Sequence, residues 1–204
     1  MFMLYNNQCS DKARGFTLVE MLVSIFVFIV VMLIATGAIL SILDANRKTQ
    51  TVQLVMNNVN FAMESMARTM RTGTKYHCNF NDTTPHPRTE PNDCLTPASS
   101  IVFEEANGSG TDPNDNWVYQ LNTTTKQIEL SENTGSTFTA ITSPSVAVTD
   151  LAFYVLDSDD LDPPGVNRRQ PRIIMVVRGT SGAQARTATT FNLQTVISQR
   201  LPDI

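Results

Sequence analysis

The stretch Gly15-Phe16-Thr17-Leu18-Val19-Glu20-Met21 opens an apolar run that continues to Leu43 and decides how this chain folds. Only five of the 28 residues from Phe16 to Leu43 are polar, and Glu20 is the only charged one. As a helix rising about 1.5 Å per residue, the run is about 42 Å long, which exceeds the ~30 Å hydrocarbon core of a bilayer. The segment can therefore cross a membrane.

Glu20 is the residue that a simple membrane span does not explain. An isolated carboxylate in hydrocarbon costs several kcal/mol unless a partner neutralises it. Cleavage after Gly15 would create a free amino group on Phe16, and Glu20 of one copy could pair with the Phe16 amine of a neighbour. The sequence thus predicts a processed N-terminus and a charge pair between copies.

These residues resemble a known family. A basic leader, then Gly15 followed by Phe-Thr-Leu-Val-Glu and an apolar helix, resembles the processing signature of type IV pilins and of the pseudopilins of type II secretion. The resemblance covers roughly residues 12–43. It implies that a prepilin peptidase cuts after Gly15 and methylates the new amine of Phe16.

The resemblance also implies a location and partners. It places the N-terminus in the cytoplasm, a single span in the cytoplasmic (inner) membrane and the remaining chain outside the cytoplasm. The partners it implies are other pilin or pseudopilin subunits and the assembly machinery of the cytoplasmic membrane. The charges flanking the span, Lys12 and Arg14 before it and Arg47 and Lys48 after it, favour an orientation only weakly.

Two simpler readings compete with this resemblance. A secretory signal peptide has an apolar core of about 7–15 residues, and the run here is about twice that length. A plain signal anchor explains the apolar length and the basic flank, but it leaves Glu20 unexplained. The processed filament subunit accounts for both features.

Composition limits the classes of partner. The whole chain has a net charge of −4, and removing the leader's Lys12, Arg14 and Asp11 leaves 13 basic and 18 acidic residues, a net charge of −5. Nucleic acid binding by bulk electrostatics is therefore not expected. About 130 residues follow the first helix, which is enough for one small domain with its own core.

Helical periodicity continues beyond the apolar run. Apolar residues recur at spacings of three or four and form one stripe: Val52, Val55, Val59, Ala62, Met66 and Met70. No proline interrupts residues 16–72, and Gly73 is a suitable C-terminal stop. We expect one helix over Phe16 to Thr72 and four segments: a leader (1–15), a transmembrane or filament-core half (16–43), an amphipathic half (44–73) and a β-rich domain (74–204).

The rest of the chain favours short strands. Prolines at 85, 87, 91 and 97 predict a loop without secondary structure from Thr74 to Ser100. Beyond it, β-rich stretches predict strands over 101–103, 117–121, 127–130, 146–156, 173–178 and 189–198. The expected fold class is α+β and pilin-like, with one long N-terminal helix packed on an antiparallel sheet.

Three cysteines reduce to one pair after processing. Cys9 lies in the leader, which leaves Cys78 and Cys94 in a compartment where disulfides persist. A bridge between them would contribute about 3 kcal/mol in the entropic model of loop closure. Two nearby histidines, His77 and His86, allow a zinc site to be imagined, but the spacing matches no familiar zinc pattern.

Calcium is the only cofactor that the sequence suggests. Several pseudopilins bind calcium through C-terminal loops, and carboxylates cluster in one loop here: Asp157, Asp159, Asp160 and Asp162. The loop lacks the glycine and distal glutamate of an EF-hand, and arginines at 168, 169 and 172 could neutralise it, so a solvated acidic loop is favoured. A second stretch, Asp112 to Asn116, begins with EF-hand spacing but has Trp117 in the glycine position.

No catalytic motif is present, so an enzyme is not expected. Residues 57–71 and 191–200 loosely resemble J-type pseudopilins and W-type minor pilins, which favours a minor filament subunit. The alternative is a membrane-anchored extracytoplasmic binding protein that does not polymerise. Substitution of Glu20 separates the two, because only assembly depends on that carboxylate.

Overall fold

A computed structural model describes residues 15–81, 90–109, 112–158, 170–181 and 189–200. The chain divides into two compact units, Met1–Asn46 and Arg47–Ile204. The leader before Gly15, with Cys9, lies outside the described residues.

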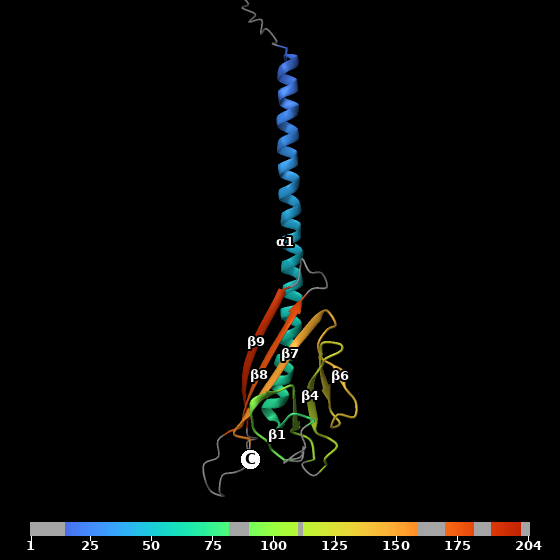
Figure 1. Cartoon of the computed structure of the whole chain (residues 1–204), viewed down its shortest axis with the longest axis vertical. Coiled ribbons are helices and arrows are strands. Elements are labelled where there is room, and N and C mark those ends of the chain that lie inside the picture. The colour runs from blue at the N-terminus through green and yellow to red at the C-terminus, as the bar shows by residue number, and fades with distance from the viewer. Residues whose placement is uncertain (1–14, 82–89, 110–111, 159–169, 182–188, 201–204) are drawn as a thin grey trace, which may run out of the picture. The chain divides into compact units, whose positions relative to one another are not determined.

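The first unit holds the N-terminal part of helix α1 (Leu18–Thr72), drawn in blue in Figure 1. Thr17 caps the helix, because its hydroxyl accepts a hydrogen bond from the Glu20 amide at 3.3 Å. The helix therefore begins two residues later than expected. The hydroxyls of Ser24 and Thr36 each donate to the carbonyl four residues earlier at 2.7 Å, so they need no partner outside the helix.

In the second unit α1 becomes amphipathic, as its sequence predicts. Its buried side chains form one stripe: Val55, Val59, Ala62, Met63, Met66 and Met70. Val52, at the start of the predicted stripe, is half-buried. The helix ends at Thr72, and the Gly73 amide donates to the Thr69 carbonyl at 3.1 Å, so the predicted stop is confirmed.

The strands form two antiparallel sheets (Figure 1). The five-stranded sheet has the order β1 (Thr74–Cys78), β3 (Ser100–Glu104), β4 (Trp117–Asn122), β5 (Gln127–Ser131) and β6 (Thr139–Ala140). The four-stranded sheet has the order β2 (Cys94–Ala98), β7 (Val146–Leu156), β8 (Arg172–Ser181) and β9 (Thr189–Ser198).

This arrangement confirms the α+β, pilin-like fold class and divides the expected single sheet into two. Strands β7 and β9 have the predicted bounds, whereas β3, β4, β5 and β8 extend one to three residues beyond them. The short strand β6 was not expected.

The prediction that residues 74–100 lack secondary structure is wrong. Strand β1 is held on one side by β3 and on the other by Asn92, which bonds to the Cys78 amide at 3.3 Å and to the Tyr76 carbonyl at 2.9 Å. Strand β2 contains Pro97, which an edge strand tolerates because one side needs no donor. The prolines at 85 and 87, and His86, lie outside the described residues.

One hydrophobic core unites the second unit. The buried stripe of α1 packs with side chains of both sheets, including Phe103 and Tyr119 from one and Phe153 and Met175 from the other. The rings of Phe103 and Tyr119 stack with centroids 5.9 Å apart. Both sheets therefore cover the same helix stripe.

Candidate functional site

The predicted cleavage site lies in the short non-helical segment before α1. Gly15 and Phe16 precede the Thr17 cap, and the Phe16 side chain is 78% exposed. No atom lies within 4 Å of the position that a Gly15 Cβ would occupy. The peptide bond between the two residues is thus not enclosed by the described chain.

Glu20 lies in the first turn of α1, where a carboxylate is favoured by the helix dipole. Its side chain is exposed, and within the described residues it forms no ion pair. The nearest basic residues along α1 are Arg47 and Lys48, more than seven turns away along the helix. A positive partner for Glu20 in an apolar environment therefore has to come from outside this part of the chain.

The surface around Glu20 is apolar on every side of the helix. Every described residue from Gly15 to Gln50 is exposed, including the phenylalanines at 26 and 28. The best 18-residue window of α1 has a mean hydropathy of 2.9, and the helix is long and apolar enough to cross a membrane. A helix that is apolar all round needs lipid or other helices as its surroundings.

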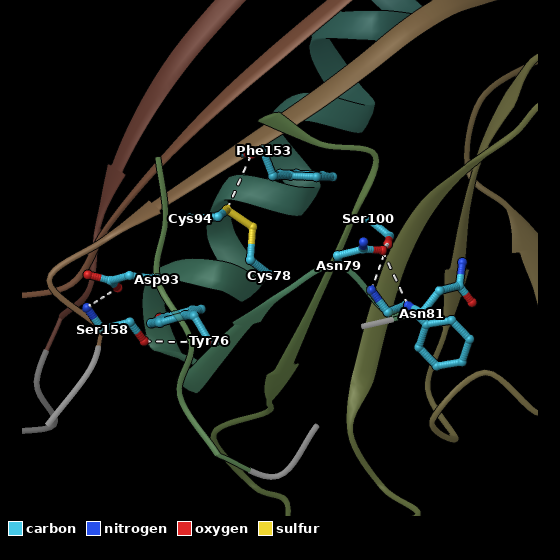
Figure 2. The surroundings of a disulfide bond; sticks show 10 residues. Tyr76, Cys78, Asn79, Asn81, Asp93, Cys94, Ser100, Phe153 and Ser158 are labelled. Carbon is cyan, nitrogen blue, oxygen red and sulfur yellow. Dashed lines mark hydrogen bonds between the residues drawn. A yellow bond between two sulfur atoms is a disulfide. The ribbon is translucent and has the colours of Figure 1, made fainter. Parts of the chain in front are cut away.

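The disulfide between Cys78 and Cys94 is confirmed, with Cα atoms 5.9 Å apart (Figure 2). Cys78 is the last residue of β1 and Cys94 is the first of β2, so the bridge joins the two sheets. The pair is consumed in this bond, and Nδ1 of the neighbouring His77 lies 3.0 Å from the Glu90 carbonyl. The structure thus has a covalent crosslink where a zinc site could be imagined.

Hydrogen bonds missed from the sequence surround this crosslink. The Asp93 carboxylate accepts from the backbone amides of Asp157 and Ser158 at 2.8 and 2.7 Å. The Ser158 hydroxyl donates to the Tyr76 carbonyl at 3.0 Å (Figure 2). These bonds fix the end of β7 against β1 and the start of β2. The only signal in the sequence is that Asp93 directly precedes a cysteine.

The C-terminal end of α1 is held by residues distant in sequence. The Tyr76 hydroxyl lies 2.5 Å from the Met70 carbonyl and 2.6 Å from that of Gly73, and it can donate to either. The Gln199 side chain donates to the Gly73 carbonyl at 2.9 Å, and the Arg200 amide donates to the Arg71 carbonyl at 2.7 Å. The carbonyls of Met70, Arg71 and Gly73 thus have hydrogen-bond donors near the end of the helix. Burial raises the pKa of Tyr76.

Of the four calcium candidates, the structure describes only Asp157, whose carboxylate is 2.7 Å from the Arg172 guanidinium. Asp159, Asp160 and Asp162 lie outside the described residues. Among the residues that are described, no three His, Cys, Asp or Glu side chains are grouped to hold a metal ion. Calcium binding by the 157–162 loop stays a prediction.

Comparison with known families finds one match. Residues 10–36 match the prokaryotic N-terminal methylation motif. The matched segment contains Gly15, Phe16 and Glu20 and the first five turns of α1. Neither the curated proteins nor the solved structures gave a match to this chain.

Proposed function

We propose that this chain, whose N-terminal methylation motif is the signature of type IV pilins and pseudopilins, is a subunit of a type IV pilus or a type II secretion pseudopilus. One observation carries the proposal: an exposed helix that is apolar on every side begins within the matched motif and has a single carboxylate in its first turn. A soluble domain does not explain the exposed apolar helix, and a simple membrane anchor does not explain the carboxylate in its first turn.

The chemistry starts at the bond between Gly15 and Phe16. Hydrolysis by a prepilin peptidase removes the leader and leaves a free amine, which the same enzyme methylates. A secondary amine stays protonated at neutral pH, so the new terminus carries a positive charge. That charge is the partner that Glu20 lacks within the described residues.

Assembly then follows from charge and burial together. Before assembly, the span lies in the cytoplasmic membrane with its N-terminus on the cytoplasmic side and the disulfide-bonded domain outside. On joining a filament, Glu20 of one subunit pairs with the Phe16 amine of its neighbour, and the apolar halves of the helices pack together. Neutralising both charges in an apolar core favours one axial register between neighbours.

We further propose that the subunit is a minor one. The support is the loose resemblance of residues 57–71 and 191–200 to J-type pseudopilins and W-type minor pilins. A minor subunit can be rare in the filament and still be required for its formation.

The first experiment is the intact mass and N-terminal sequence of the protein recovered from membranes. The proposal expects a chain that begins at methylated Phe16, with a mass lower than that of the reduced protein by two hydrogen atoms. A chain still carrying its leader, in cells with an active prepilin peptidase, would overturn the proposal and leave a membrane-anchored extracytoplasmic binding protein.

The second experiment replaces Glu20 by alanine and counts filaments or measures secretion. We expect assembly to be lost while processing and the folded domain remain intact. The matched control is Glu64→Ala, which also removes an exposed carboxylate from α1. The Glu64 carboxylate lies 3.6 Å from the Arg68 guanidinium. Equal assembly by both variants would contradict the pairing of Glu20 with a neighbour.

A further inference from the structure

Three asparagines of this chain begin the tripeptide Asn-X-Ser/Thr in which X is not proline: Asn81, Asn107 and Asn122. This tripeptide accepts N-linked oligosaccharides on surface loops of proteins that leave the cytoplasm. The tripeptide alone does not make a site, because a transferase must also reach the asparagine amide. The structure separates the candidates by exposure and by the bonds of each asparagine side chain.

Asn122 is engaged in its own turn. It is the last residue of β4 and is half-buried. Its Nδ2 donates to Glu129 Oε1 at 2.8 Å, and its Oδ1 accepts from the amides of Thr124 and Thr125 at 2.9 and 3.1 Å. Both ends of this side-chain amide therefore stabilise the connection from β4 to β5. The threonine of the Asn81 tripeptide lies outside the described residues.

Asn107 lies in an exposed turn directly after β3. The Gly108 amide donates to the Glu105 carbonyl at 2.9 Å, which closes the turn. Every residue from Ala106 to Ser109 is exposed. The two side chains that define an acceptor tripeptide, the asparagine amide and the serine hydroxyl, thus belong to surface residues.

The Glu105 carboxylate fixes Asn107 in this turn. Its Oε2 accepts from the Asn107 backbone amide at 2.7 Å, and its Oε1 accepts from Asn107 Nδ2 at 3.2 Å. A carboxylate that accepts a hydrogen bond from an amide makes the amide nitrogen more electron-rich. At the same position in the other two tripeptides, two residues before the asparagine, the chain has Asn79 and Gln120, which carry no charge.

The backbone of the turn is anchored on the domain. A Cβ at Gly108 would lie 2.3 Å from Oε1 of Glu104, the last residue of β3, so the turn passes directly over that side chain. The Ser109 amide donates to Asp115 Oδ2 at 2.7 Å. The exposed side chains of Asn107 and Ser109 therefore stand on an ordered surface.

We propose that Asn107 is a site of N-linked glycosylation, with an oligosaccharide on a polyprenyl diphosphate as the donor. In the transfer, Nδ2 of Asn107 forms a bond to the anomeric carbon of the sugar, and the bond from that carbon to the phosphate oxygen breaks. The polyprenyl diphosphate leaves, and Nδ2 loses one proton. The transfer takes place outside the cytoplasm, so the inference rests on the location of the domain in the proposed function.

The test is peptide mapping by mass spectrometry of the full-length protein recovered from the membranes of the cells that naturally make it. Fragmentation that leaves sugars attached should place an oligosaccharide on Asn107. Asn107→Gln should lose this added mass completely. A sugar bound to the Ser109 hydroxyl would survive that substitution and would overturn the proposal.

Two substitutions of Ser109 test the tripeptide without touching the asparagine. Ser109→Ala should lose the added mass, whereas Ser109→Thr should keep it, because threonine also completes the acceptor. The matched control is Asn122→Gln, which removes another Asn-X-Thr tripeptide and should leave the added mass unchanged. Equal thermal unfolding of Ser109→Ala and Ser109→Thr shows that the loss does not come from misfolding.

Three further results would overturn the proposal. They are an unmodified Asn107, a sugar confined to Asn81 or Asn122, and a gain of only one dalton at Asn107, which is the mark of spontaneous deamidation before glycine. The peptide that begins at Phe16 reports leader cleavage in the same digest. A processed chain without sugar therefore contradicts this inference alone, whereas a glycosylated chain that keeps its leader contradicts the filament proposal alone.

Discussion

The two halves of α1 use their apolar residues in opposite ways. From Gly15 to Gln50 every described residue is exposed, although most are apolar. From Val55 to Met70 six residues are buried in one stripe, with polar side chains on the other face. Continuous apolarity means that the partners of a helix lie outside its own chain, whereas periodic apolarity means that they lie within it.

The largest test of this contrast replaces one methionine in each half by alanine. Met66 is fully buried, so Met66→Ala should lower the free energy of unfolding by roughly 2–5 kcal/mol. Met32 is 51% exposed, and Met32→Ala should leave the unfolding of the domain unchanged. Denaturant titration in detergent, followed by the near-ultraviolet circular dichroism of the buried tyrosines, measures both. Equal losses would show that the first half also packs within its own chain.

Removing the disulfide should give the next largest effect, and it should affect only the second half of α1 and the sheets that cover it. The bridge spans 16 residues and joins the two sheets that cover the second half, so replacing both cysteines by alanine should cost about 3 kcal/mol. Helix content in the first half should not change, because neither cysteine lies in that unit. Far-ultraviolet circular dichroism and denaturant titration of the double variant check both statements. A loss of helix before the domain unfolds would contradict the separation.

The third test uses pH to probe the packing of the second half. Burial raises the pKa of Tyr119 to about 12, although its contact with Thr69 of α1, at 2.9 Å, lowers it. The folded state therefore holds this phenolic proton more tightly than the unfolded state, whose tyrosine pKa is about 10. The resulting stabilisation is complete below pH 10 and is lost as pH rises through 12, so the free energy of unfolding should be lower by roughly 2 kcal/mol at pH 12 than below pH 10.

Absorbance of tyrosinate during alkaline titration measures this directly. Tyr119→Phe should remove one titration step near pH 12 and leave the steps of the other tyrosines. If the lost step instead falls near pH 10, Tyr119 is not buried against the helix.

Much of this structure could be predicted from local pattern. The helix, five of the six buried stripe residues and the bounds of β7 and β9 follow from periodicity, because each depends on neighbours close in sequence. The disulfide between Cys78 and Cys94 followed from the number of cysteines, because only these two lie outside the predicted leader. Glu20 was also evident, since a lone acid in an apolar helix is a strong local anomaly, and cleavage after Gly15 stays a prediction.

What could not be predicted depends on pairing between distant segments. Strands β1 and β2 were not predicted because prolines surround them. In addition, Lys75 and Asn79 have positive φ values of 53° and 70°, and the sequence pattern gives no sign of these backbone irregularities. The burial of Glu104 was also missed, since a glutamate after an apolar strand normally marks the strand's exposed end. Only the turn packed over it makes that position buried.

The hydrogen bonds at the end of α1 have a mechanical consequence. Gly73 leads along the chain into β1 of one sheet, while Gln199 and Arg200, which follow β9 of the other, bond to Gly73 and Arg71. A pull along α1 would therefore divide at this point, one share passing through the backbone and the other through β9. Because the disulfide couples the two sheets again, the load would be spread over the whole domain instead of peeling strands away one by one.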